Sequence, residues 1–86
     1  MDAKVIKDLI SEMNPDALFA NGFEDALIGY VEQFNRILAC YDRDKCLEIL
    51  MKRDGMTEEE AEEYFCFNVT GSWVGENTPA FFTRME

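Results

Sequence analysis

The side chains of this chain that could do chemistry are three cysteines and eighteen carboxylates, and its 86 residues include no histidine. Cys40, Cys46 and Cys66 are odd in number and form no CxxC pair, so neither a disulfide framework nor a zinc site is expected. Histidine is the commonest general base and the usual partner of a nucleophilic serine or cysteine. We therefore expect no catalytic residue, metal or cofactor; the alternative is a small enzyme that works through Cys66 or a carboxylate.

The carboxylates are densest after Thr57, where five glutamates occur within six residues. Thr57 followed by Glu60 predicts a capping box, in which the hydroxyl accepts the Glu60 amide and the carboxylate accepts the Thr57 amide. A helix should start here, with acids at the favourable end of its dipole. The cap needs only one glutamate, so the others form a candidate partner-binding surface, with two loop residues as the next candidates: Glu58, Glu59, Glu62, Glu63, Trp73 and Glu76.

The net charge of −10 limits the kind of partner that this chain can bind. Phosphates would be repelled, so direct binding to nucleic acid is disfavoured. Two interpretations of the acid remain. It can keep a small protein soluble and monomeric, or it can bind a basic partner, such as a protein that itself binds nucleic acid.

Length and composition predict one globular domain spanning residues 1–86, with 48% hydrophobic and 30% charged residues. No apolar run approaches the roughly 18–20 residues of a membrane span. The opening segment, MDAKVIKDLISEM, has charges threaded through it. It is therefore not expected to be a signal peptide, and a cytoplasmic location follows by default.

Hydrophobic spacing and turn signals predict an α+β fold. Two strands so close in sequence should pair as an antiparallel hairpin, and two helices follow them. A last strand would complete a small three-stranded, mostly antiparallel sheet with the helices on one face. In chain order the expected elements are a helix over 1–13, strands over 26–34 and 37–41, helices over 42–55 and from 57 to about 69–71, and a strand over 80–83.

Three positions allow two interpretations each. Gly29, inside the first strand, marks either a bulge or close helix packing, or else the contact of a partner. Trp73 either closes one end of the core or is a partly exposed anchor for another protein. Cys46 lies in the apolar arc of its helix and is either a core residue or a nucleophile. Phe67 is expected on the flank of the core face of its helix.

Three segments carry a resemblance: FEDALIGY at 23–30, YDRDKCLEILM at 41–51 and MTEEEAEEYFCFNVTGSWVGENTPAFF at 56–82. Together they resemble a family of small, uncharacterised, acidic proteins of bacteriophages, prophages and mobile elements. The resemblance implies a protein made in a host cytoplasm that inhibits a host protein, with CRISPR and other defence components as candidate targets. It carries over no catalytic or ligand residue. The alternative is a structural or self-assembling module, such as a homodimer formed through the exposed edge of the sheet.

Overall fold

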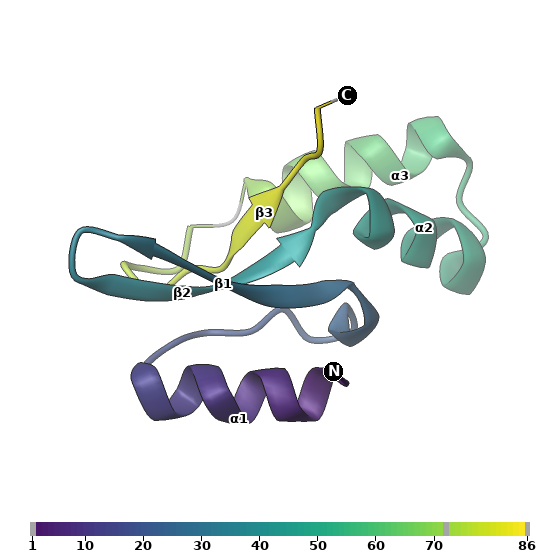
Figure 1. The fold of residues 1–86 in the computed structure, drawn as a ribbon. Coiled ribbons are helices and arrows are strands. Elements are labelled where there is room, and N and C mark those ends of the chain that lie inside the picture. Colours follow the sequence, from purple (N-terminus) through teal and green to yellow (C-terminus); the bar gives the residue numbers. More distant parts are fainter. Residues whose placement is uncertain (1, 72, 86) are drawn as a thin grey trace.

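The structure is a computed structural model that describes residues 2–71 and 73–85. Its elements follow one another in the predicted order, which confirms the α+β class (Figure 1). They are α1 (Ala3–Met13), a 3₁₀ turn η1 (Glu24–Ala26), β1 (Leu27–Gln33), β2 (Arg36–Asp42), α2 (Arg43–Asp54), α3 (Glu58–Phe65), a π-helical segment η2 (Cys66–Thr70) and β3 (Ala80–Phe82).

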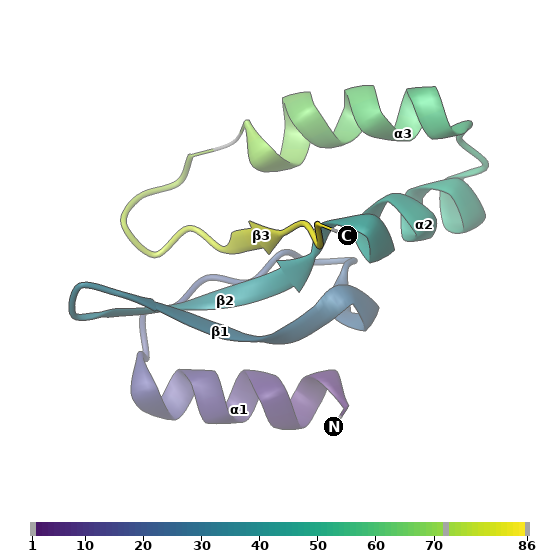
Figure 2. The same ribbon diagram turned by 45° about the horizontal axis from the view of Figure 1, so that its top comes forward.

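The sheet has the strand order β1-β2-β3. β1 and β2 form the predicted antiparallel hairpin, but β3 pairs with β2 in parallel, so the sheet is mixed rather than mostly antiparallel. The two helices between β2 and β3 are the reason. The chain leaves α3, returns to the far end of the sheet and re-enters it in the direction of β2 (Figure 2). A parallel pair requires a long crossover of this kind.

The core gathers on one face of this sheet. Ile37, Ala39 and Tyr41, which alternate along β2 and so point to the same side, belong to one apolar cluster. The same cluster contains the fully buried Ile10 of α1 and Leu50 of α2. In the view of Figure 2, α1 lies along the β1 side of the sheet and α3 along the β3 side. The helices therefore share the core that the sheet closes, as predicted.

Aromatic rings hold α3 to the sheet. Phe65 is fully buried, and its ring meets those of Phe23 and Phe81 edge to face, with centroids 6.4 and 5.1 Å away. The Phe81 ring in turn lies 5.7 Å from that of Tyr41. Contacts of this geometry stabilise a fold by about 0.5–1.5 kcal/mol each beyond the burial of apolar area. They fix which side of α3 faces the core.

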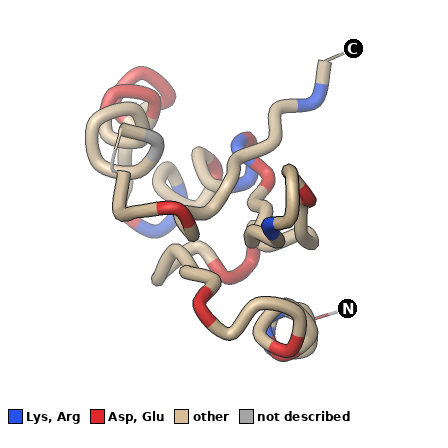
Figure 3. The backbone as a smooth tube through the Cα atoms, turned by 90° about the vertical axis from the view of Figure 1, so that its left-hand side faces the viewer, with Lys and Arg blue, Asp and Glu red and all other residues tan. Residues whose placement is uncertain are grey.

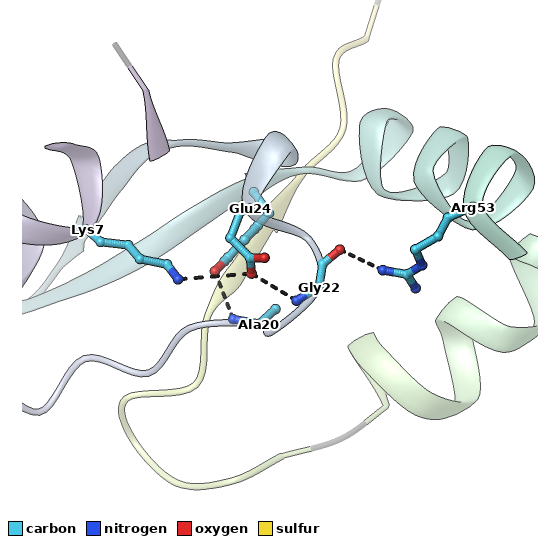
Figure 4. Close-up of polar contacts among 6 residues, drawn as sticks. Lys7, Ala20, Gly22, Glu24 and Arg53 are labelled. Atoms are coloured by element: carbon cyan, nitrogen blue, oxygen red, sulfur yellow. Dashed lines mark hydrogen bonds and ion pairs between the residues drawn. The ribbon is translucent and has the colours of Figure 1, made fainter. Parts of the chain in front are cut away.

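The connector between α1 and β1 is fastened by polar contacts (Figure 4). The backbone N–H of Ala20 donates to the Tyr41 hydroxyl at 2.8 Å. The N–H of Gly22 donates to the Glu24 carboxylate, and the Arg53 guanidinium donates to the Gly22 carbonyl, each at 2.8 Å. The turn at Asn21 and Gly22 is thereby tied to α2. Burial raises the pKa of Tyr41 to about 12, so its hydroxyl stays neutral.

Both helix starts after the hairpin form as their sequences predict. The Asp42 carboxylate accepts the Lys45 N–H at 3.3 Å, and α2 ends at Gly55, whose φ of 67° suits glycine. Thr57 and Glu60 form the capping box at the start of α3, with hydrogen bonds of 2.9 and 3.2 Å.

The first helix is less buried than its spacing predicts. α1 begins after the N-cap Asp2, whose carboxylate accepts the Val5 N–H; the predicted start at residue 1 lies outside the described residues. Ile10 is buried, but Val5, Leu9 and Met13 remain 42–45% exposed. α1 packs chiefly against the hairpin, and these three side chains lie on the part of its apolar stripe that the hairpin leaves partly exposed.

Candidate functional site

The predicted acidic surface lies on the outer face of α3. Ala61 and Phe65 are fully buried and define its inner side. Glu59 and Glu63, four residues apart, share the opposite side and are exposed. Figure 3 shows acidic residues in successive turns of α3, whereas the basic residues lie on other elements. The helix therefore presents carboxylates that its own sequence leaves uncompensated.

One of the four predicted glutamates is used within the fold. The Glu62 carboxylate lies 2.9 Å from a guanidinium nitrogen of Arg43 and 3.5 Å from the other. Its hydrogen bond to Arg43 holds the pKa of Glu62 below its usual range. In the described residues, Glu58, Glu59 and Glu63 have no ion pair of this kind. These three carboxylates, here called the acidic strip, are the ones that a partner could neutralise.

Aromatic side chains border the acidic strip. Glu63 lines a shallow hollow together with Met56, Tyr64 and Phe67. Phe67 is 82% exposed and Tyr64 is 41% exposed. The prediction that Phe67 lies on the flank of the core face is therefore wrong. A carboxylate beside exposed rings is a mixed polar and apolar surface, which suits recognition of a protein.

The position of Phe67 along the helix explains why it points outward. Phe67 lies four residues after the exposed Glu63 and two after the buried Phe65, so regular spacing places it on the outer face. The Cys66 N–H donates to the carbonyls of both Glu62 and Glu63, and the π-helical segment that follows does not return Phe67 to the core. Val69, four residues after Phe65, packs against the core.

The two loop candidates have different surroundings. Trp73 is 73% exposed, which favours the exposed-anchor interpretation over closure of the core. Glu76 lies 3.4 Å from Arg36 at the turn end of the hairpin, where Phe34 and Asn35 share its hollow. Glu76 is therefore engaged away from the acidic strip. The six predicted residues do not form one continuous surface; the four on α3 do share a helix.

Sequence reasoning missed two features of the site. Arg43 neutralises Glu62 from another helix, and a contact across 19 residues has no signal in a single sequence. Phe34 is 95% exposed, with a φ of 57°, because it occupies the hairpin turn rather than the end of the strand. The turn between the two predicted strands, over residues 33–36, is confirmed, but its exposed residue with a positive φ was not predicted.

Two of the three cysteines are buried, which favours the core interpretation of Cys46. Cys40 and Cys46 are buried, and burial raises the pKa of both, that of Cys46 to about 12. Cys66 is exposed at the end of α3. Over residues 2–71 and 73–85, no group of three or more potential ligands gathers that could hold a metal ion. Within the same residues, no helix is both long and apolar enough to cross a membrane.

Comparison with known proteins adds no relative to this description. No family model matches the chain. No curated protein and no solved structure matches it either. The resemblance to small acidic proteins of phages and mobile elements therefore stays a prediction from the three segments quoted above.

Proposed function

We propose that this chain is a non-enzymatic binding protein of phage or mobile-element origin, which inhibits a host protein by docking its acidic strip on a basic surface. The target class to test first is the CRISPR and other defence machinery, whose nucleic-acid-binding surfaces are basic. The carboxylates would occupy positions that phosphates otherwise take. The site of action would be the host cytoplasm, and nucleic acid itself would not be bound.

One observation carries this proposal. Glu58, Glu59 and Glu63 project from a rigid, capped helix and have no compensating ion pair in the described residues. A partner that supplies cations would gain their attraction without first breaking internal contacts. Electrostatic complementarity of this kind chiefly raises the association rate and fixes specificity. Exposed Phe67 and Trp73 are the aromatic side chains that such surfaces use as anchors.

The test compares two variants of equal charge. In one, Glu58, Glu59 and Glu63 are each replaced by lysine. In the control, Asp16, Asp44 and Glu48 are each replaced by lysine, because these are exposed and form no ion pair in the described part of the chain. Circular dichroism first establishes that both variants fold. Each is then used to capture partners from a host lysate at low and high salt, with identification by mass spectrometry.

The proposal expects a basic host protein that the native chain and the control retain and that the acidic-strip variant loses. Rising salt should weaken the complex, because the contact is between exposed charges. Capture of no partner, or equal loss in both variants, would count against the acidic strip. Normal binding by a Trp73→Ala variant would show that Trp73 is not part of the interface. It would leave the proposed role of α3 unchanged.

A further inference from the structure

An apolar groove runs between α1 and β1, on a part of the molecule that the acidic strip does not include. Leu9 and Met13 of α1 line it from one side, and Ile28 and Tyr30 of β1 from the other. Each of these four side chains is 43–46% exposed. A contiguous apolar surface of this kind, bordered by charged residues, marks an interaction site more often than scattered exposed side chains do.

The strand that borders the groove is an open edge of the sheet. β1 pairs with β2 on one side only, so its outer backbone groups face outward. The β1–β2 register shifts between Leu27 and Gly29, which confirms the bulge interpretation of this glycine. Close packing is excluded, because a Cβ added at Gly29 would meet nothing within 4 Å. The backbone at Gly29 is therefore accessible to another strand, as such glycines often are.

The two ends of the groove differ in charge. The end where β1 begins holds Lys45 together with Asp25, so it is the end with a cation. Glu12 lies near the end of α1, which is anchored to the other end of the hairpin by a hydrogen bond of 2.8 Å from Asn14 to the Ile37 carbonyl. Lys45 and Glu12 form no ion pair in the part of the chain that the structure describes. Each is available to a charge outside the molecule.

We propose that the groove and the β1 edge bind a second copy of this chain, with the two β1 strands antiparallel about a two-fold axis. Such an axis reverses the groove end for end, so Lys45 of each copy would face Glu12 of the other. A two-fold interface must be self-complementary in this way. The apolar rows of α1 and β1 would cover each other in the middle, and the two β1 edges would satisfy each other's backbone groups.

The order of charges is what selects a second copy over an unrelated strand. A foreign peptide could pair with β1, but it need not carry a cation and an anion in the reverse order. The homodimer is independent of the acidic strip, because α1 and β1 contribute no residue to that strip. A result that contradicts one of the two proposals therefore does not contradict the other.

Sedimentation velocity over a range of protein concentrations, with charge-reversed variants, tests the two-fold geometry. The native chain should form dimers. Lys45→Glu alone places like charges at both contacts, as does Glu12→Lys alone, so each should weaken dimerisation by about tenfold or more. In an equimolar mixture of the two variants, both contacts again join opposite charges. The mixture should therefore form heterodimers, whereas each variant alone should stay largely monomeric.

Amide hydrogen exchange gives a second measurement. Exchange in β1 should slow as the native concentration rises, while exchange in α3 should not change. A native chain that stays monomeric at every concentration would overturn the proposal. So would a dimer that the single reversals leave intact, or a mixture that stays monomeric. Concentration-independent exchange in β1, with binding of an added β-strand peptide, would assign the edge to a foreign strand instead.

Discussion

The Arg43 guanidinium lies 2.9 Å from the Glu62 carboxylate and 5.4 Å from the centre of the Phe65 ring. One side chain from the first turn of α2 thus contacts both the outer flank and the inner face of α3. The hydrogen bond to Glu62 raises the pKa of Arg43, so the guanidinium stays charged throughout. Of the four predicted glutamates on α3, Glu62 is therefore engaged in an ion pair within the fold. The other three, which form the acidic strip, are not engaged in this way in the described residues.

Replacement of Glu62 by glutamine should lower stability in a pH-dependent way. In the folded chain the pKa of Glu62 lies below its ordinary value of 4.5. The carboxylate therefore contributes stability that is fully present above about pH 4.5 and is lost as the pH falls through the lowered value. Urea unfolding at neutral pH should give a lower free energy of unfolding for Glu62→Gln than for the native chain. The difference should shrink as the pH is lowered.

Glu63→Gln is the matched control for this measurement. It makes the same chemical change in the same helix, but Glu63 has no ion pair in the described residues. Its free energy of unfolding should follow that of the native chain across the pH series. Identical pH profiles for the two variants would show that Arg43 does not stabilise α3 through Glu62.

Tyr41→Phe should destabilise the fold by about 1–3 kcal/mol, because the Ala20 N–H would lose its acceptor. The ring itself is fully buried and stays in place, so the change tests the hydroxyl alone. Denaturant unfolding measures the effect. Tyr30→Phe, at a half-exposed tyrosine, should change the free energy of unfolding much less. Equal effects would mean that the Tyr41 hydrogen bond does not fasten the connector.

The same tyrosine should make the native chain sensitive to alkali. The folded pKa of Tyr41 is about 12, against an ordinary value of 10.0. Burial of the neutral phenol therefore contributes stability that is fully present below about pH 10 and is lost as the pH rises towards 12. Unfolding experiments between these values should show a smaller loss in Tyr41→Phe than in the native chain. The loss that remains comes from the buried thiols Cys40 and Cys46, whose pKa is also raised.

Local signals in the sequence predicted most of the fold. Asp42 and Gly55 bound α2, and Thr57 with Glu60 starts α3, because a cap depends on residues within one turn of each other. The parallel pairing of β3 depends instead on where two helices return the chain, and nothing in the three residues Ala80–Phe82 encodes that. The strands of the sheet were therefore predicted correctly, but the parallel direction of β3 was not.

The candidate site was less predictable than the fold. Helical spacing placed Glu59 and Glu63 opposite the buried Ala61 and Phe65, whereas Glu58 is exposed because it begins the helix. The prediction misplaced Phe67, although regular spacing puts this residue one turn after Glu63 on the outer face. It also could not separate Glu62 from its neighbours. Which charge is neutralised depends on Arg43, a residue from another helix.

The thiols should differ sharply in reactivity. Burial raises the pKa of Cys46 to about 12 and raises that of Cys40, whereas Cys66 is exposed. A thiol reagent such as a disulfide dye should therefore titrate one cysteine rapidly in the native chain and all three in denaturant. In Cys66→Ser the fast phase should disappear. A fast phase that persists would mean that Cys40 or Cys46 is more accessible than the structure indicates.

The hairpin turn offers a change that should stabilise the chain. Phe34 has a φ of 57° and is 95% exposed, so its backbone is strained while its ring gains little from packing. The left-handed conformation costs an L-residue with a Cβ about 1–2 kcal/mol, and glycine avoids that cost. Phe34→Gly should therefore raise the free energy of unfolding by about 1 kcal/mol, after the greater freedom of glycine in the unfolded chain is deducted.

Urea unfolding of Phe34→Gly and of the control Asn35→Gly checks this expectation. In the described residues, Phe34 alone among those with a side chain has a positive φ, so glycine at Asn35 relieves no such strain and should be neutral or destabilising. Equal effects at the two positions would mean that the turn is not strained at Phe34. A stabilised Phe34→Gly variant that also keeps its partner in the lysate capture would show that this exposed ring serves neither the fold nor that interface.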